Sequence, residues 1–216
     1  MGTRYTAKQG DYLAKIAREQ GFSDYKTIWD DPQNAKLKEQ RKNPNVLYPG
    51  DLLYIPDRQT KEQMGSTEAK HHFQVKQGRM MLRLVLEDLY GKPLADAKCE
   101  LTVEGKTSKL VADSAGKIET EILPTAERAE LIVKDGTTPL KDQRLILQIG
   151  HLDPIEELSG QRARLSNLGY FLGSIDQGDT EGFKSAVEEF QCDFGLAVDG
   201  ICGPKTQAKL KQVHGC

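Results

Sequence analysis

The pattern of apolar and polar residues divides the chain into three segments of different texture. In the first, apolar residues recur at helical spacing over 11–20 and again over 25–30, and short apolar runs lie at 4–7 and 52–55. Helical spacing predicts helices, and short apolar runs bounded by turn residues predict strands. We therefore expect a β-α-α-β order in residues 3–58.

Two polar stretches interrupt this first pattern. Residues 31–45 are mostly polar and are longer than a small core requires, so we expect a connection there. Pro49-Gly50 suits the middle of a type II turn, because glycine accepts the positive φ of the third turn position. Residues 59–69, RQTKEQMGSTE, have no periodic apolar pattern and are expected to be a linker.

The second segment, 70–152, has the texture of β-structure. Apolar and polar residues alternate in five short runs, at 82–86, 99–104, 118–122, 129–133 and 145–149. Glycine-containing turns punctuate these runs, at 90–93, 104–105, 115–116 and 135–136. Short strands at this spacing predict a β-sandwich.

The third segment, 153–216, is expected to be helical. Apolar positions at helical spacing predict three helices, the first over about 155–168 with a break at Gly160, and the others around 183–190 and 204–213. Pro204 suits the first turn of the last helix, where a missing N–H costs nothing. The whole chain is thus expected to be a multidomain α+β protein.

Composition and charge exclude several classes of protein. Of the 216 residues, 38% are hydrophobic and 29% are charged, with a formal net charge of -2. No segment is strongly basic, so we expect no nucleic-acid partner. No apolar run approaches the roughly 20 residues that span a bilayer, so no membrane insertion is expected. The first residues, MGTRYTAKQGDY, lack the apolar core of a Sec signal peptide, so we expect cytoplasmic synthesis.

The cysteines and histidines offer little for catalysis or metal binding. No CxxC pair is present, and the adjacent His71 and His72 would face opposite ways on a strand, so we expect no metal and no cofactor. Neither a GxSxG elbow nor an HExxH motif occurs, so we expect no enzyme. A disulfide among the last three cysteines is expected only if the protein reaches an oxidising compartment, and it would join two of Cys192, Cys202 and Cys216.

The first segment resembles a LysM domain. The matching residues are Tyr5-Thr6, Gly10-Asp11, Leu13, Ile16-Ala17, Asn45, Leu47, Pro49-Gly50, Leu53 and Ile55-Pro56. The resemblance implies a glycan groove between two loops, formed by Gly10, Asp11, Tyr12, Leu13, Leu47, Tyr48, Pro49 and Gly50. Loops fixed by glycine and proline can present backbone groups to acetamides, and tyrosines can supply ring faces. Tyr12 stands where the family carries Thr or Ser, and the apolar members of the set have a simpler reading as core.

The last segment resembles the peptidoglycan-binding domain 1 family, a three-helix module. The matching residues are Gln161, Leu165, Leu168-Gly169-Tyr170, Ala186-Val187, Phe190-Gln191, Gly195-Leu196, Asp199-Gly200, Gly203-Pro204, Thr206 and Leu210. The resemblance implies a binding surface that includes Tyr170, Asp199 and Gly200. The middle segment resembles Ig-like or transthyretin-like accessory modules, whose pattern most sandwiches share.

Taken together, the segments resemble proteins of type VI secretion and related contractile injection systems. Those proteins join a LysM-like start to a β module and, through a GHLDP-like junction, to a peptidoglycan-binding end; here the junction reads IGHLDPIEELSG, 149–160. The resulting expectation is a non-catalytic binder of peptidoglycan glycan strands, delivered to the periplasm or a target-cell envelope by a secretion apparatus. The alternative is an adaptor that binds a spike or effector protein without binding sugar. The expected domains are 3–58, 70–152 and 153–216.

Overall fold

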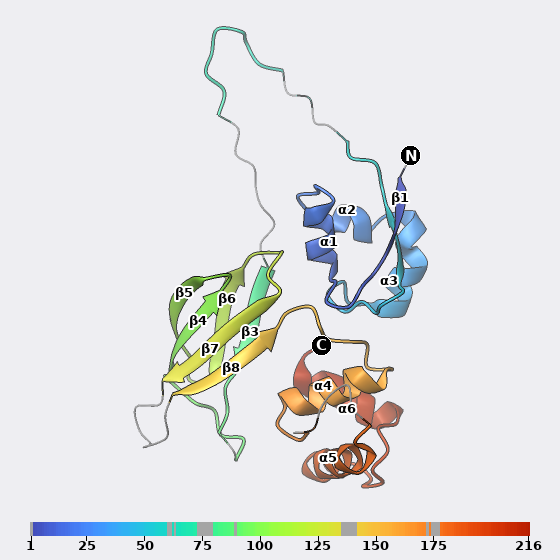
Figure 1. Ribbon diagram of the computed structural model, residues 1–216, viewed down its shortest axis with the longest axis vertical. Helices are drawn as coiled ribbons and strands as arrows, with labels where there is room; N and C mark the ends of the chain where they lie inside the picture. Colours follow the sequence, from blue (N-terminus) through green and yellow to red (C-terminus); the bar gives the residue numbers. More distant parts are fainter. Residues whose placement is uncertain are drawn as a thin grey trace.

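Three domains follow one another along the chain in the computed structural model (Figure 1). The residues that the structure describes are 2–59, 62, 64–72, 80–88, 90–134, 142–171, 173 and 178–216. The described part of 59–69 has no helix or strand. Among the described residues, no helix has the length and apolar character needed to cross a bilayer.

The N-terminal domain packs short helices against a two-stranded sheet. Its elements are β1 (Thr3–Thr6), α1 (Leu13–Glu19), α2 (Lys26–Trp29), the 3-10 helix η1 (Pro32–Asn34), α3 (Ala35–Arg41) and β2 (Leu52–Ile55). Strands β1 and β2 are antiparallel, with Thr3 opposite Ile55. The predicted strands and first two helices are present, but η1 and α3 lie between α2 and β2, so the predicted β-α-α-β order is incomplete. The turn before β2 is closed by a hydrogen bond of 2.9 Å from Asp51 N–H to Tyr48 O, and Gly50 has a φ of 99°.

The polar stretch 31–45 is not the expected plain connection, because it forms η1 and α3. Asp31 caps η1 by accepting a hydrogen bond from Gln33 N–H. Buried Asn34 donates from its amide to Ile28 O and Tyr54 O and accepts from Tyr54 N–H, each at 2.7–2.8 Å. One side chain therefore joins the end of α2 to β2. A single apolar residue of α3, Leu37, enters the core, which is why the hydrophobic pattern did not reveal the helix.

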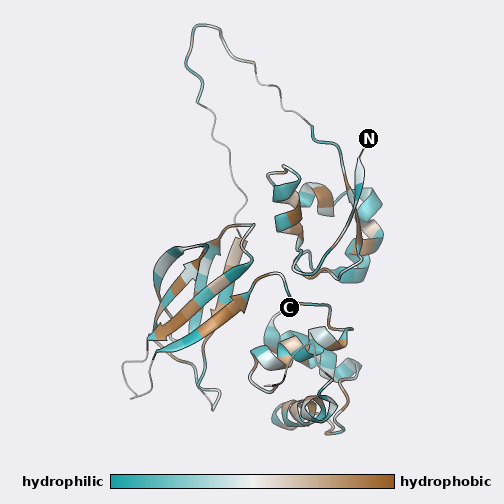
Figure 2. Cartoon of the chain, in the orientation of Figure 1, coloured by the Kyte–Doolittle hydropathy of each residue, from teal (hydrophilic) through white to brown (hydrophobic). Residues whose placement is uncertain are grey.

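The β domain consists of two antiparallel sheets that share one core. Its strands are β3 (Met80–Val85), β4 (Lys98–Val103), β5 (Lys106–Val111), β6 (Lys117–Ile122), β7 (Arg128–Lys134) and β8 (Gln143–Gln148). One sheet pairs β3 with β6, and the other has the order β5-β4-β7-β8. Alternate residues of β4, β6 and β7 meet in the core between them. Figure 2 shows the alternation of hydrophobic and hydrophilic residues along these strands.

Five of the six strands coincide with the alternating runs of the sequence, whereas β5 does not. Its sequence, KTSKLV, is mostly polar, because β5 is an edge strand with four of its six residues exposed. The predicted turn at 104–105 joins β4 to β5, and both of its residues have positive φ. The predicted turn at 135–136 lies outside the described residues.

The C-terminal domain contains the three expected helices, α4 (Leu158–Asn167), α5 (Thr180–Asp193) and α6 (Pro204–His214). Their core includes Ile155, Leu165, Val187, Phe190 and Leu210. The expected break at Gly160 is wrong, since α4 runs through it. A Cβ at this position would come within 2.0 Å of Pro154 O, so glycine permits the close approach of the junction to the helix.

Candidate functional site

The loop between α5 and α6 is fixed by one buried side chain, Gln191. Its amide nitrogen donates to Asp199 Oδ1 at 2.8 Å, to Thr206 Oγ1 at 3.0 Å and to Ile201 O at 3.1 Å. Its amide oxygen accepts from Asp199 N–H and Gly200 N–H, both at 3.0 Å. A single amide therefore holds both the loop and the first turn of α6 in place.

The Asp199-Gly200 turn lies at the surface with its shape already set. Asp199 Oδ1 also accepts from Ile201 N–H at 2.9 Å. This backbone hydrogen bond, with that from Gln191, lowers the pKa of Asp199, so the carboxylate stays charged at neutral pH. Val198 and Ile201 flank the turn and are 57% and 65% exposed. The loop thus offers an anionic, hydrogen-bonding centre between two exposed apolar side chains.

Tyr170, the other candidate of this domain, is held against α5. Its hydroxyl donates to Asp193 Oδ2 at 2.9 Å, and its ring meets Phe190 edge-on with centroids 5.4 Å apart. Burial and the acceptor Asp193 raise the pKa of Tyr170, so the phenol remains neutral. Phe190 and Gln191 are consecutive residues of α5, and they connect Tyr170 to the turn at Asp199.

The two loops of the predicted groove in the N-terminal domain do lie side by side. Gly50 N–H donates to Ala7 O at 2.9 Å, and Leu13 N–H donates to Pro44 O at 3.0 Å. Asp11 closes the first loop, where its Oδ2 accepts from Tyr5 Oη and from Lys8 N–H, both at 2.8 Å. Burial and this acceptor raise the pKa of Tyr5 to about 12. Asp11 thus has an internal role.

Most of the predicted groove residues are not exposed. Gly10, Asp11, Leu13 and Leu47 are buried, Tyr48 is half-buried, and Pro49 and Gly50 are exposed. Asp51, after the turn, receives two hydrogen bonds of 2.8 Å from the Arg41 guanidinium, and both side chains are only 8% exposed. Arg41 also lies over the Tyr48 ring, 5.8 Å from its centroid. Helix α3 therefore supports the second loop.

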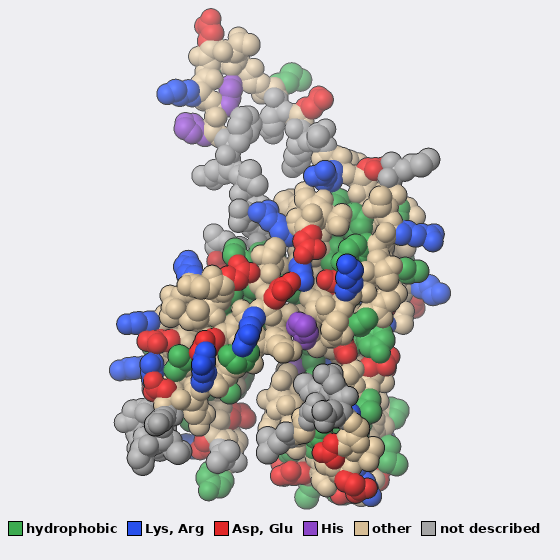
Figure 3. Space-filling model, in the orientation of Figure 1, with side chains coloured by type: hydrophobic (Ala, Val, Ile, Leu, Met, Phe, Trp, Pro, Cys, Tyr) green, Lys and Arg blue, Asp and Glu red, His purple; other side chains and the backbone are tan. Residues whose placement is uncertain are grey.

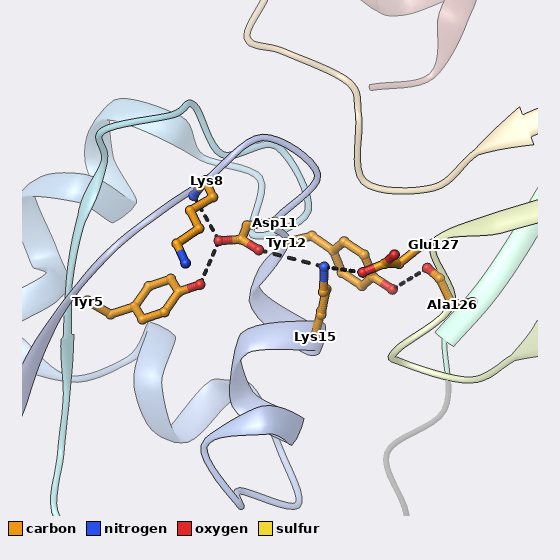
Figure 4. Close-up of polar contacts among 7 residues, drawn as sticks. All are labelled: Tyr5, Lys8, Asp11, Tyr12, Lys15, Ala126 and Glu127. Atoms are coloured by element: carbon orange, nitrogen blue, oxygen red, sulfur yellow. Dashed lines mark hydrogen bonds and ion pairs between the residues drawn. The ribbon is translucent and has the colours of Figure 1, made fainter.

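Tyr12 does not present its ring to solvent, contrary to its expected role as a sugar-stacking face. It is 1% exposed and belongs to the core of the β domain. Its hydroxyl donates to Ala126 O at 2.7 Å, as Figure 4 shows. Beside it, Lys15 Nζ lies 2.6 Å from Glu127 Oε1 and 3.8 Å from Asp11 Oδ1. The aromatic side chain is large enough to reach the next domain.

The remaining candidates of the sequence concern cysteine and metal chemistry. All four cysteines are free thiols, so Cys192, Cys202 and Cys216 form no disulfide here. Burial raises the pKa of Cys202 to about 11. Within the described residues, no group of three or more His, Cys, Asp or Glu side chains is arranged to hold a metal ion.

Two residues that order the sites were missed by sequence reasoning about function. Gln191 belongs to the family-like spacing, but a glutamine in a helix gives no sign that it will be buried and multiply bonded. Glu127 contacts Lys15 across 112 positions of the chain, and a single sequence carries no signal of such a pair.

Comparison with known proteins identifies the C-terminal domain. Residues 161–210 match the family described as "Putative peptidoglycan binding domain". A stretch of 78 residues, 36% of the chain, is 36% identical to N-acetylmuramoyl-L-alanine amidase CwlM of Mycobacterium tuberculosis and covers 19% of it. A stretch of 57 residues, 26% of the chain, is 39% identical to the spore cortex-lytic enzyme of Oceanobacillus iheyensis and covers 21% of it.

These matches cover only part of the chain and a small part of each relative. The chain spans about a fifth of the length of these curated relatives. No solved structure matches the chain. The family match covers all of α5, most of α4 and α6, and the Gln191-ordered turn between α5 and α6. Residues 161–210 are a peptidoglycan-binding domain.

Proposed function

We propose that this chain is a non-catalytic peptidoglycan-binding protein that contacts glycan strands through the turn at Asp199. The observation that carries the proposal is the preformed turn, in which Gln191 fixes a charged carboxylate between exposed Val198 and Ile201 inside the matched domain. A rigid polar centre with apolar flanks suits an amphipathic sugar with N-acetyl groups, since little ordering is needed on binding.

The test is co-sedimentation with washed peptidoglycan sacculi over a range of salt concentrations. Asp199→Asn keeps an acceptor oxygen for the two internal hydrogen bonds and removes only the charge, whereas Ile201→Ser removes exposed apolar surface. Each variant should weaken pelleting, the second by roughly three- to tenfold for the buried side chain that is lost. Ser185→Ala, an exposed change on α5, is the control. Unchanged pelleting in both variants would remove this turn as the contact.

A non-catalytic role also needs its own assay, because the relatives of the matched domain are named as an amidase and a cortex-lytic enzyme. Incubation of the protein with sacculi should release no soluble muropeptides while the protein pellets with them. Release that depends on the protein would overturn the binding-only proposal.

The wider proposal is an accessory of a type VI or related contractile injection system, delivered by that apparatus. It is supported by the order of a small α+β domain with a Pro-Gly turn, a β domain, and the 149–160 junction into the C-terminal helices. We further propose that the N-terminal domain is LysM-like. Co-purification with secretion components from the native cell is the corresponding test.

One observation favours the second candidate function, an adaptor for a spike or effector protein. Tyr12 contacts the β domain instead of offering its ring to a sugar, so this surface of the N-terminal domain is used for a protein contact. An adaptor would capture a partner from the native cell as well when Ile201→Ser has weakened sacculus binding.

A further inference from the structure

The junction between the β domain and α4 runs along the predicted glycan groove of the N-terminal domain. At one end, Gln9 Nε2 lies 3.4 Å from Asp153 Oδ1. A Cβ placed on Gly10 would come within 2.9 Å of the His151 ring. At the other end, a cavity of about 120 Å³ is lined by residues 40–43 and Val46 on one side and by 154–156 on the other. The junction therefore lies against the first loop of the groove and, at the cavity, reaches Val46 beside the second loop, whose Pro49 and Gly50 stay exposed.

Gly150 is the point of closest approach. It has a φ of 82°, and a Cβ there would come within 2.3 Å of the Tyr12 ring and 2.8 Å of Gly10 O. Only glycine lets the junction lie this close to the first groove loop in this backbone conformation. Ile149, the residue before Gly150, is bonded to the β domain, because its N–H donates to Glu127 O at 2.9 Å.

Tyr12 and Lys15 connect the first groove loop to residues 126–127 of the β domain as well. The Tyr12 hydroxyl bonds to Ala126 O, and Lys15 pairs with Glu127, the neighbour of Ala126 (Figure 4). The hydrogen bond that Lys15 donates to Glu127 raises the pKa of Lys15 and lowers the pKa of Glu127, so both stay charged over the physiological range. The first groove loop is thus held between 126–127 and 150–153.

We propose that residues 150–156 act as an intramolecular occupant that closes the N-terminal groove against glycan. The inference rests on the proposal that the N-terminal domain is LysM-like, with the glycan groove that this resemblance implies. In the closed state the protein binds the wall through its C-terminal domain alone, and the N-terminal groove becomes available only when the junction leaves it. Affinity measured on the closed chain is then reduced by the fraction of molecules that are open.

The matched pair Gly150→Ala and Gly105→Ala tests the proposal. Both glycines have positive φ, 82° and 79°, so both substitutions impose the same backbone strain. Only Gly150→Ala also drives a methyl group into Tyr12, because a Cβ on Gly105 meets nothing within 4 Å. Binding of a soluble N-acetylglucosamine hexamer to the full chain is measured by calorimetry, and hydrogen exchange of 149–153 reports opening.

We expect Gly150→Ala to exchange faster at 149–153 and to bind the hexamer at least about tenfold more tightly than the wild type. Gly105→Ala should match the wild type in both measurements. Faster exchange without a gain in affinity would overturn the proposal, as would tight hexamer binding by the wild type with no change in the variant. Exchange equal to that of Gly105→Ala would show that the junction does not close the groove.

Glu127→Lys provides a second route that leaves every groove residue unchanged. It sets two lysines against each other where Lys15 and Glu127 now pair, and Glu68→Lys in the exposed linker is the control for net charge. A smaller gain in hexamer affinity, about two- to fivefold, is expected because exposed ion pairs contribute little. Pelleting with sacculi should persist in all of these variants. If the wild type itself did not pellet, that result would count against the C-terminal domain as the wall contact.

Discussion

At Gln191, one buried amide determines the shape of the turn at Asp199. Its five hydrogen bonds reach Asp199, Gly200, Ile201 and Thr206. Among the exposed side chains nearby, those of Val198 and Ile201 make none of these hydrogen bonds and can change with little effect on the fold, whereas Asp199 Oδ1 accepts from Gln191 and from Ile201 N–H. The shape of this turn, the proposed wall contact, therefore depends on a buried side chain.

Replacing Gln191 with leucine should separate loop order from helix packing. The side chain keeps its approximate volume but leaves Asp199 N–H, Gly200 N–H and the Thr206 hydroxyl without their partner. We expect a loss of about 2–4 kcal/mol in unfolding free energy, together with weaker sacculus pelleting. Urea denaturation measures the first, and Gln207→Leu, on the half-buried side of α6, is the comparison. Equal losses in the two variants would contradict the special role of Gln191.

His214 gives the fold a dependence on acid. Burial, with the positive charge of Arg164, lowers the pKa of His214 to about 4 from an ordinary 6.5. The unfolded chain therefore takes up a proton on this ring below pH 6.5, whereas the folded chain does so only near pH 4. Stability from this group is complete above pH 6.5 and falls between pH 6.5 and 4, by roughly 1–2 kcal/mol once its partial exposure is considered.

The measurement is urea unfolding at intervals from pH 7.5 to 4, on the wild type and on His214→Gln. The difference in stability between the two proteins should shrink as the pH falls, because glutamine does not titrate. A difference that stays constant with pH would show that the imidazole is not protected from protonation.

The sequence pattern predicted which site residues lie in a core better than it predicted which ones are exposed to solvent. Leu13 and Leu47 were expected to have a simple role in the core, and both are buried there. Tyr12 could not be predicted from sequence, because its partner Ala126 lies 114 positions away and contributes a backbone oxygen, which every residue has. Sequence periodicity describes packing within an element, and this contact joins two domains.

Among the elements, α3 shows how a polar helix can be essential to a small domain. It carries Arg41, whose guanidinium is buried with the Asp51 carboxylate, and it follows Asn34, which joins α2 to β2. Helix α3 was missed, as β5 was, because few of its residues are apolar. Helix α4 was expected to break at Gly160 because glycine disfavours helices, but packing against the junction outweighs that propensity.

Arg41→Ala should destabilise the N-terminal domain by about 3–5 kcal/mol, since it leaves the buried Asp51 carboxylate unpaired. Lys38→Ala on the same helix is the matched control: its ion pair with Asp30 is 2.6 Å long but about half exposed. The control should cost under about 1 kcal/mol. Urea unfolding of both variants decides between them, and similar costs would mean that the Arg41–Asp51 pair is not important for the fold.

Over the whole molecule, the N-terminal domain contacts both of the others through its first loop and α3. Figure 3 shows charged side chains of both signs mixed over the visible face, with the β domain and the C-terminal helices standing apart below the point where the three domains meet. The sequence predicted three domains, with a linker at 59–69 between the first and the second. It could not predict that the first domain folds back onto the junction, because this docking depends on contacts between residues more than one hundred positions apart.

Tyr12→Phe should lower the melting temperature, because it leaves Ala126 O without its buried donor. The expected cost of about 1–3 kcal/mol corresponds to roughly 2–10 °C for a chain of this size. Tyr90→Phe, on a side chain that is 94% exposed, should leave the melting temperature unchanged. Calorimetry should also show that the N-terminal and β domains melt together in the wild type and separately in Tyr12→Phe; coincident melting in the variant would argue against Tyr12 as the link.

The position of Gly150 also limits how such a chain can evolve by exchange of modules. Domains that are joined by independent linkers and do not contact one another can be exchanged one at a time. Here Tyr12 of the N-terminal domain packs against Gly150 and donates to Ala126 O, both of which belong to the rest of the chain. A first domain taken from another protein would carry a different side chain at this contact. Inheritance of the three parts as one block is the arrangement that keeps Tyr12 and Gly150 matched.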